Sequence, residues 1–284
     1  MNILEMFDQV STEIKQGDFL STGWSEIDRD CYGRGLKSGR LVFLQARPKV
    51  GKSYMIINWM HRLAKLGLKS YMFSMEMSAL DCIIRLLQLA QQESANEIIH
   101  NLMSGINKDR MVETLSAFEE LITIDDRKGL SLIDIDKTVS ATHDGVHYFF
   151  IDHIHKIQTR HIEIFKATTE ITNRLYLTAH KYNTRLISAV QVHRGAEAWE
   201  IPNPHDAKGS GSIEEDADLI IGMCRPEINP NCEEGSKGQV HIKITANRFG
   251  NDGYKIRLVM NRETSLLMQE DECINQNRNQ KYSE

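Results

Sequence analysis

The chain has 284 residues, of which 41% are hydrophobic and 26% are charged. These fractions are typical of a folded globular protein, and the length allows one large domain or two small ones. The formal net charge of −5 argues against a broadly basic protein, so a nucleic-acid site would have to be a local basic patch. The sequence shows no secretory signal and no apolar run long enough to cross a bilayer. We therefore expect a cytosolic protein without a membrane partner.

Cysteines and histidines show no spacing typical of a metal site. The five cysteines are odd in number, scattered and never spaced as C-x-x-C, so we expect reduced thiols without a disulfide framework or a cysteine zinc site. His153, His155 and His161 lie close together in the sequence. Ordinary core or surface roles are favoured for them, because no cysteine with ligand spacing accompanies them.

The first segment, residues 1–18, carries an apolar stripe at helical spacing. We predict a helix there, which either docks on a neighbouring subunit or folds back on its own core. A short helix and a glycine-rich turn are expected over residues 21–40, ahead of the first strong strand signal. The apolar positions of the first segment are Ile3, Leu4, Met6, Phe7, Val10 and Ile14.

A phosphate-binding loop is predicted after the apolar, β-prone run 41–45. Gly51, Lys52 and Ser53 follow that run, and apolar residues at helical spacing begin at Tyr54. Strand, tight loop and helix is the context in which backbone N–H groups hold phosphate oxygens. We expect Lys52 to reach the outer phosphates of a nucleotide and Ser53 to hold Mg²⁺. Ala46 replaces the usual first glycine, and the predicted cofactor-binding residues are Ala46, Arg47, Pro48, Lys49, Val50, Gly51, Lys52 and Ser53.

A carboxylate, Glu76, follows the next predicted strand, residues 69–73. We expect that strand to adjoin the nucleotide strand, which would place Glu76 at the sheet edge where ligands bind in open α/β folds. There it could orient and activate the water that attacks a γ-phosphate. In the alternative interpretation Ser74, Glu76 and Ser78 satisfy backbone donors at a helix start. The two interpretations are compatible.

Two further strands are predicted to end in polar side chains. The aromatic run 147–151 leads to Asp152, and the run 184–190 leads to Gln191. Behind a phosphate-binding loop, an aspartate at a buried strand tip is expected to hold a water of the Mg²⁺ shell. Gln191 could hydrogen-bond the γ-phosphate or the attacking water, and an ordinary loop amide is the equally weighted alternative.

The stretch from 192 to 212 is polar and interrupted by glycine and proline, and we expect a long loop without secondary structure of its own. It carries the basic residues Arg194 and Lys208 and the small residues Gly209 and Gly211. Backbone amides at the two glycines could approach a phosphate chain closely, which fits a nucleic-acid loop. A surface excursion with solvated charges is the alternative.

Residues 239–268 alternate as strands, and the turn residues 247–253 predict a hairpin-like connection between them. Arg248 is expected to be exposed near the tip of this connection. An exposed arginine at a turn is most often a solvated charge. In a ring of ATPases it would instead be placed to reach the γ-phosphate of a neighbouring subunit as an arginine finger.

In this order the motifs resemble the RecA-like C-terminal motor domain of DnaB-type replicative helicases. The resemblance implies an α/β fold, with a RecA-like P-loop NTPase core, a largely parallel central sheet flanked by helices, and a C-terminal antiparallel extension. It divides the chain into a linker-like helix (1–20), a motor domain (21–268) and a polar tail (269–284). The matching stretches are 21–24, 46–53, 73–78, 150–152, 191–195, 209–218 and 247–250.

The same resemblance implies a function. It implies an ATP- and Mg²⁺-dependent DNA helicase that moves along single-stranded DNA and unwinds duplex during replication. Its partners would be further copies in a hexameric ring, with a primase or helicase loader. Residue by residue, the resemblance gives Glu76 the role of catalytic carboxylate, Asp152 that of Mg²⁺-shell acid and Gln191 that of coupling residue. It places Arg194, Lys208, Gly209 and Gly211 in the DNA loop and Arg248 on the finger.

Two departures from the family pattern keep other functions open. The basic residue two places before the finger is Ala246 here, and we expect the N-terminal helical domain of the family to be missing. One alternative is a RecA- or KaiC-like ATPase that switches or assembles without unwinding. The other is a helicase-derived regulatory subunit that binds ATP and nucleic acid, although the retained Lys52, Glu76 and Asp152 argue against it.

Overall fold

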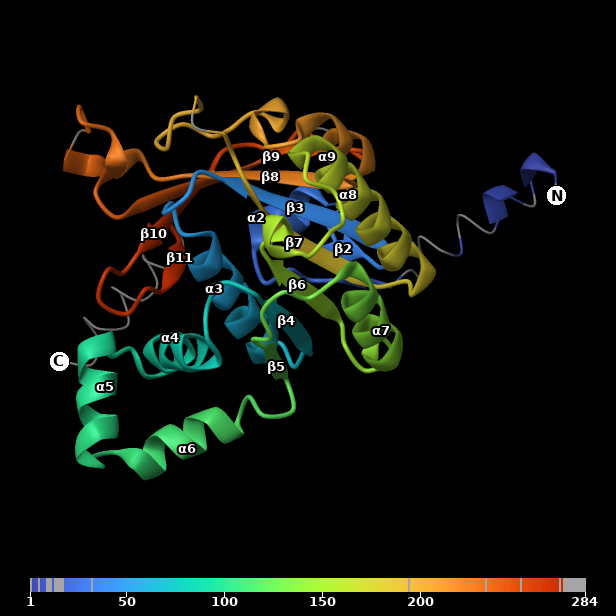
Figure 1. Cartoon of the computed structure of the whole chain (residues 1–284). Helices are drawn as coiled ribbons and strands as arrows, with labels where there is room; N and C mark the ends of the chain where they lie inside the picture. Colours follow the sequence, from blue (N-terminus) through green and yellow to red (C-terminus); the bar gives the residue numbers. More distant parts are fainter. Residues whose placement is uncertain are drawn as a thin grey trace.

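The chain folds as a twisted sheet with helices on both faces (Figure 1). This computed structural model describes residues 2–4, 6–8, 12, 18–31, 33–193, 195–232, 234–250, 252–270 and 272. Within them the large sheet has the order β11-β10-β9-β8-β3-β7-β6-β4-β5. Its strands are β3 (Arg40–Ala46), β4 (Ser70–Ser74), β5 (Ile122–Asp125), β6 (Tyr148–Asp152), β7 (Arg185–Gln191), β8 (Leu219–Cys224), β9 (Gln239–Asn247), β10 (Ile256–Met260) and β11 (Leu267–Gln269).

Six neighbouring strands, from β8 to β5 in the sheet order, pair in parallel, whereas β9, β10 and β11 pair antiparallel. This arrangement confirms the predicted fold class, including the antiparallel extension at the C-terminal end. A small second sheet pairs β1 (Phe19–Leu20) with β2 (Leu36–Lys37). The helices are α2 (Ser25–Asp30), α3 (Lys52–Lys65), α4 (Ala79–Gln91), α5 (Ala95–Ser104), α6 (Lys108–Ser116), α7 (Leu132–Thr142), α8 (Ile164–Lys181) and α9 (Ser210–Asp216).

The central strands are buried on both faces, because helices cover the sheet from both sides. Alternate residues of a strand point to opposite faces, so each strand contributes to two cores. On β3, Val42 and Leu44 pack in the core beneath α3 and α4. Leu41 and Phe43 pack in the other core, with residues of α7, α8 and α9. This explains why the strand is a continuous apolar run rather than an alternating one.

Two predictions about local structure are wrong. The strand before Glu76, β4, does not adjoin β3, because β7 and β6 lie between them in the sheet. Residues 192–212 are not structureless either. They contain the bridge of Val192 with Ala207, a 3₁₀ turn over Pro204–Asp206 and the start of α9. Strand order depends on pairing between distant segments, which local sequence patterns do not reveal.

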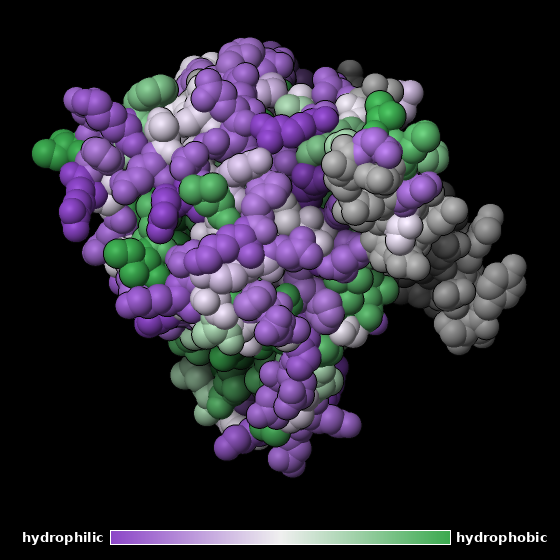
Figure 2. Space-filling model, turned by 90° about the vertical axis from the view of Figure 1, so that its right-hand side faces the viewer, coloured by the Kyte–Doolittle hydropathy of each residue, from purple (hydrophilic) through white to green (hydrophobic). Residues whose placement is uncertain are grey.

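Two predictions fall mainly outside the described residues, namely the N-terminal helix over 1–18 and the polar tail over 269–284. In the described part, no helix is both long and apolar enough to span a membrane. The face shown in Figure 2 is largely polar, with apolar side chains in separate groups. Among the described side chains, several exposed apolar ones gather on α5 and α6 and in the loop after α5, namely Ile99, Leu102, Met103, Ile106 and Val112.

We expect the sheet core beneath α3 to dominate stability. The Phe150 side chain is fully buried, and its ring meets the edge of Trp59 with centroids 5.8 Å apart. Phe150→Ala should lower the free energy of unfolding by about 3–5 kcal/mol, because it removes packed apolar surface and leaves a cavity. Urea unfolding followed by circular dichroism measures this change. Tyr254→Ala, at a side chain that is 78% exposed, is the control and should cost less than about 0.5 kcal/mol. Equal losses in the two variants would contradict the assignment.

Candidate nucleotide site

The predicted phosphate-binding loop lies at the carboxyl edge of the parallel strands, between β3 and α3. Two residues of the loop have positive φ angles, Lys49 at 67° and Gly51 at 115°. Left-handed backbone is tolerated best by glycine, and this geometry folds the loop tightly enough for Lys52 to bend back over it. The Lys52 ammonium donates hydrogen bonds to the carbonyls of Ala46 (3.0 Å) and Arg47 (3.2 Å).

Lys52 and Asp152 are buried charges at the centre of this edge. Burial lowers the pKa of Lys52 to about 8, although Asp152 and Glu76 oppose the shift. Burial also raises the pKa of Asp152, with Glu76 adding to the rise and with the Ser53 hydroxyl and Lys52 opposing it. Apart from the Ser53 hydroxyl, which is near enough to lower this pKa, no described residue offers the Asp152 carboxylate oxygens a hydrogen bond. Because a buried polar group without a partner is costly, this carboxylate is poised for a ligand.

Glu76 reaches the same cavity although its strand lies further along the sheet than predicted. The turn after β4 is held against β6 by the Met75 N–H, which donates to the Asp152 carbonyl (3.1 Å). Ser78 caps α4 with its hydroxyl and shares a capping box with Asp81, so the predicted helix start is confirmed at Ser78. The Ser74 hydroxyl instead donates to the Met77 carbonyl. The Glu76 side chain is half exposed and lines the cavity.

Gln191 stands at the tip of β7, opposite Ala46 of the phosphate-binding loop. Its side-chain nitrogen lies 3.0 Å from Nε2 of His153, and the same ring nitrogen lies 3.4 Å from Oε2 of Glu76. His153 directly follows Asp152 and is 2% exposed. Burial lowers its pKa to about 3 and the pKa of the nearby His155 to about 4. Both imidazoles are therefore neutral at physiological pH.

A cavity of about 390 Å³ unites these groups, lined by Lys52, Ser53, Glu76, Asp152 and Gln191 among others. It also exposes a residue that the sequence analysis missed, Arg85 of α4. The Arg85 guanidinium stacks on the Tyr54 ring at 3.7 Å, and its Nη1 is buried without a hydrogen-bond partner in the described part of the chain. A guanidinium held in this way can bind an anionic ligand by donating hydrogen bonds to it. Its mid-helix position gives no local sequence signal.

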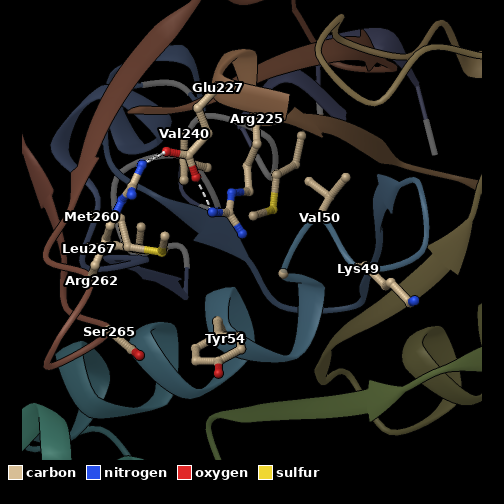
Figure 3. Close-up of a pocket in the computed structure, with 12 residues that line it drawn as sticks. Lys49, Val50, Tyr54, Arg225, Glu227, Val240, Met260, Arg262, Ser265 and Leu267 are labelled. Atoms are coloured by element: carbon tan, nitrogen blue, oxygen red, sulfur yellow. Dashed lines mark hydrogen bonds and ion pairs between the residues drawn. The ribbon is translucent and has the colours of Figure 1, made fainter. Parts of the chain in front are cut away.

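A second cavity, of about 340 Å³, opens on the other side of the loop (Figure 3) and shares Lys49, Gly51 and Tyr54 with the first. Its apolar wall comes from β8–β11 and the loop, with Val50, Met223, Val240, Met260 and Leu267. Its polar group is an ion-paired cluster, in which the Glu227 carboxylate accepts hydrogen bonds from Arg225 and Arg262. Apolar walls with a few fixed polar groups are typical of sites for small organic ligands.

Of the predicted nucleic-acid residues, Lys208 contacts Gln191 directly. The Lys208 N–H donates to the Gln191 carbonyl (3.1 Å), and Arg47 Nη1 donates to the carbonyl of His193 (3.1 Å). Gly209 is the N-cap of α9 and has a φ of 81°, and a Cβ atom there would lie 2.7 Å from Thr168. Gly211 is exposed. The remaining predicted residue, Arg194, lies outside the described residues.

Arg248 lies at the opposite edge of the sheet from these residues. It follows β9, whose last residue, Asn247, pairs with Leu219 at the start of β8, whereas the phosphate-binding loop follows the end of β3. The guanidinium donates to the Glu215 carbonyl and lies 3.8 Å from the Asp218 carboxylate. Its side chain is 40% exposed. Within one chain, the topology keeps Arg248 away from Lys52.

The fold and this edge define a RecA-like P-loop NTPase domain. The model of the DnaB-like helicase C-terminal domain matches residues 20–268, and the chain belongs to this family. A solved ATPase domain superposes with a TM-score of 0.83 and 23% identity, over 94% of this chain and 98% of that one. A DnaB-like replicative helicase studied for its interactions with primase gives a TM-score of 0.81 and 23% identity, over 94% of this chain and 67% of that one.

Proteins of similar sequence belong to the same family. The replicative DNA helicase DnaB of Haemophilus influenzae is 27% identical over 262 residues, which cover 87% of this chain and 54% of that protein. A probable plasmid replicative DNA helicase of Chlamydia trachomatis serovar L2 is 29% identical over 244 residues, 82% of this chain and 51% of that protein. The chain thus spans about half the length of the curated relatives it matches. The resemblance drawn from the motifs is confirmed.

The ion-paired cluster of the second cavity should make the free energy of unfolding depend on pH in the acid range. Burial opposes the shift, but hydrogen bonds from the Gly238 N–H, Arg225 and Arg262 lower the pKa of Glu227 from 4.5 to about 2. Because the folded-state pKa lies below the unfolded one, unfolding takes up a proton in this window, and stability should fall as the pH falls from about 4.5 to 2.

The measurement is the urea midpoint against pH. Glu227→Gln should be less stable than the parent at pH 7 and should lose less stability between pH 5 and 2. Glu234→Gln is the control, because the Glu234 side chain is 94% exposed. Parallel curves for the parent and Glu227→Gln would rule out this contribution.

Proposed function

We propose that the chain is the motor domain of a DNA helicase, which hydrolyses ATP with Mg²⁺ and moves along single-stranded DNA to unwind duplex during replication in the cytosol. The observation that carries the proposal is the convergence of Lys52, Glu76, Asp152 and Gln191 on one cavity at the carboxyl edge of a RecA-like sheet. Membership of the DnaB-like family supports the choice of reaction.

ATP would span both cavities. Its phosphates would lie in the first, against the loop amides, Lys52 and Arg85, where positive charge and N–H donors compensate anionic oxygens. Its base and ribose would lie in the second, against the apolar wall and beside Arg225. Glu227 would hold Arg225 in place there. The shared lining of the cavities by Lys49, Gly51 and Tyr54 supports one ligand that crosses the loop.

The residues present also fit a magnesium ion. Both oxygens of Asp152 are buried and, apart from the Ser53 hydroxyl, have no hydrogen-bond partners in the described structure, and such oxygens are free to hold a cation. Carboxylate and hydroxyl oxygens are ligands that Mg²⁺ prefers, directly or through water. Asp152 and Ser53 would therefore hold the ion, which would neutralise part of the phosphate charge when bound.

The positions of the site residues give each of them a role in hydrolysis. Glu76 lies at the open side of the cavity, half exposed, where it would accept the proton of a water aimed at the γ-phosphate. Gln191 would hydrogen-bond that water or the phosphate and would sense the loss of the phosphate. Lys52 would remain protonated on the anionic ligand, because bound phosphates favour its charged form.

Each complete site would lie between two copies of the chain in a ring, hexameric by analogy with the family pattern. Arg248 is at the edge opposite its own Lys52, so only a neighbouring copy can receive it as an arginine finger. Lys208, Gly209 and Gly211 would bind the DNA backbone, with Arg194 in the same loop. A primase or a helicase loader would be a further partner, and the likeness to a helicase studied for its interactions with primase supports the first of these.

Two other functions remain as rivals. A RecA- or KaiC-like ATPase would bind the same nucleotide without unwinding duplex. A regulatory subunit would bind nucleotide and DNA without turnover, and Ala246 in place of the family's basic residue is the observation that favours it. The retained charges of Lys52, Glu76 and Asp152 favour a hydrolase over a subunit that only binds.

The deciding measurement is ATP hydrolysis with and without single-stranded DNA, followed by unwinding of a forked duplex, with particle size recorded in the same samples. We expect hydrolysis that DNA stimulates and that falls at least about a hundredfold in Lys52→Ala and Glu76→Gln. Glu26→Gln, remote from the cavity, is the control. Turnover without unwinding would favour the RecA-like rival, and binding without turnover would favour the regulatory one.

Mixing two inactive variants tests the role of Arg248 as an arginine finger. Arg248→Ala alone and Lys52→Ala alone should each be nearly inactive. Mixed in equal amounts, they should regain a substantial part of the parent activity, because some interfaces combine an intact Lys52 from one subunit with an intact Arg248 from the next. If the two residues served the same copy, no interface could be complete and mixing would restore nothing. Arg257→Ala, an exposed arginine on β10, should behave like the parent.

A further inference from the structure

Two histidines lie between the nucleotide cavity and the segment that carries Lys208. His153 meets the cavity side, with Nε2 lying 3.0 Å from the Gln191 amide nitrogen and 3.4 Å from Oε2 of Glu76. His155 meets the other side, with Nε2 3.4 Å from the Lys208 carbonyl. The two rings lie 5.6 Å apart, centroid to centroid. A contiguous line of side chains thus runs from Glu76 to Lys208.

The same two ends are joined a second time through the backbone. The Lys208 N–H donates to the Gln191 carbonyl at 3.1 Å, while the Gln191 side chain contacts His153. The peptide groups of Lys208 are therefore fixed on one side by β7 and on the other by His155. A displacement of Gln191 or His153 cannot leave Lys208 undisturbed, because close-packed contacts transmit small shifts.

Nε2 of His153 can form only one of its two hydrogen bonds, to Glu76 or to Gln191, at a time. With the proton on Nε2 it donates to the Glu76 carboxylate, and with Nε2 bare it accepts from the Gln191 amide. The Nδ1 atom has no hydrogen-bond partner within the described chain, so no neighbour fixes the tautomer. Two discrete arrangements are what a coupling element requires.

We propose that His153 and His155 are positioning residues that couple the nucleotide site to the Lys208 segment. The proposal rests on the proposed function, since it takes the two ligands to be a nucleotide and single-stranded nucleic acid. When the γ-phosphate recruits the Gln191 amide, His153 loses its contact with Gln191 and keeps its contact with Glu76. The change reaches Lys208 through His155 and through the Gln191 carbonyl.

The test measures coupling rather than activity. Binding of a fluorescein-labelled oligo(dT) to the full chain is titrated with and without Mg²⁺ and a non-hydrolysable ATP analogue, and the ratio of the two dissociation constants is the coupling factor. We expect a factor of roughly 5–150 for the parent. His155→Ala should bind each ligand alone within about threefold of the parent, while its coupling factor falls to the part carried by the Gln191 carbonyl alone.

Two variants separate coupling from a structural effect. His155→Gln should recover coupling, because its amide N–H reaches about as far as Nε2 and can donate to the Lys208 carbonyl. His100→Ala, at an exposed histidine on α5, is the matched control and should keep the parent factor. In hydrolysis assays, His153→Gln should lower kcat more than it raises KM, because it disturbs Glu76 without touching the phosphate-binding loop.

The outcomes are distinguishable. A parent-like coupling factor in His155→Ala overturns the proposal, and so does a parent that binds both ligands with a coupling factor of one. A parent that binds no oligonucleotide or no nucleotide overturns the proposed function, and the coupling proposal with it. A reduced coupling factor in His155→Ala with recovery in His155→Gln supports the proposal.

Discussion

The site depends on one constraint, which is that the carboxyl ends of parallel strands meet at the same edge of a sheet. Here β3, β7 and β6 are neighbours, and their last residues are Ala46, Gln191 and Asp152. Because successive residues of a strand face opposite sides, a register slip of one residue would turn these side chains away from the cavity. The two apolar cores that hold the strands in register therefore also hold the chemistry in place.

The charges at this edge are only partly balanced without a ligand. The Lys52 ammonium bonds to two backbone carbonyls. Among the described residues, by contrast, one buried nitrogen of Arg85 has no hydrogen-bond partner, and the Asp152 carboxylate has none apart from the Ser53 hydroxyl. Such groups cost free energy in the unliganded protein. A triphosphate with a divalent cation offers both the negative and the positive charge that they lack, so the binding free energy includes the relief of that cost.

Much of this arrangement could be predicted from the sequence, because β6 and β7 are largely apolar runs that each end in a polar residue. This pattern predicts the places of Asp152 and Gln191. It does not predict the neighbours of β4, since strand order follows from contacts between distant segments, and the sheet places β6 and β7 between β4 and β3. Arg85 gave no signal because it lies within a helix. The partners of His153 come from two other strand ends, so the chain neighbours of that histidine give no sign of its contacts.

Under the proposed function, the position of Arg248 would make hydrolysis depend on assembly. In one copy the guanidinium lies on the Glu215 carbonyl and near Asp218, at the edge away from the phosphate-binding loop. To act as a finger it must give up these contacts and bind a phosphate of the nucleotide held by a neighbouring copy. A strongly anionic ligand would compensate the lost contacts better than a weakly anionic one. Ala246 supplies no second charge two residues earlier. Hydrolysis in this chain would then depend on a single guanidinium at each interface, and the interface would be productive only while it is closed around bound nucleotide.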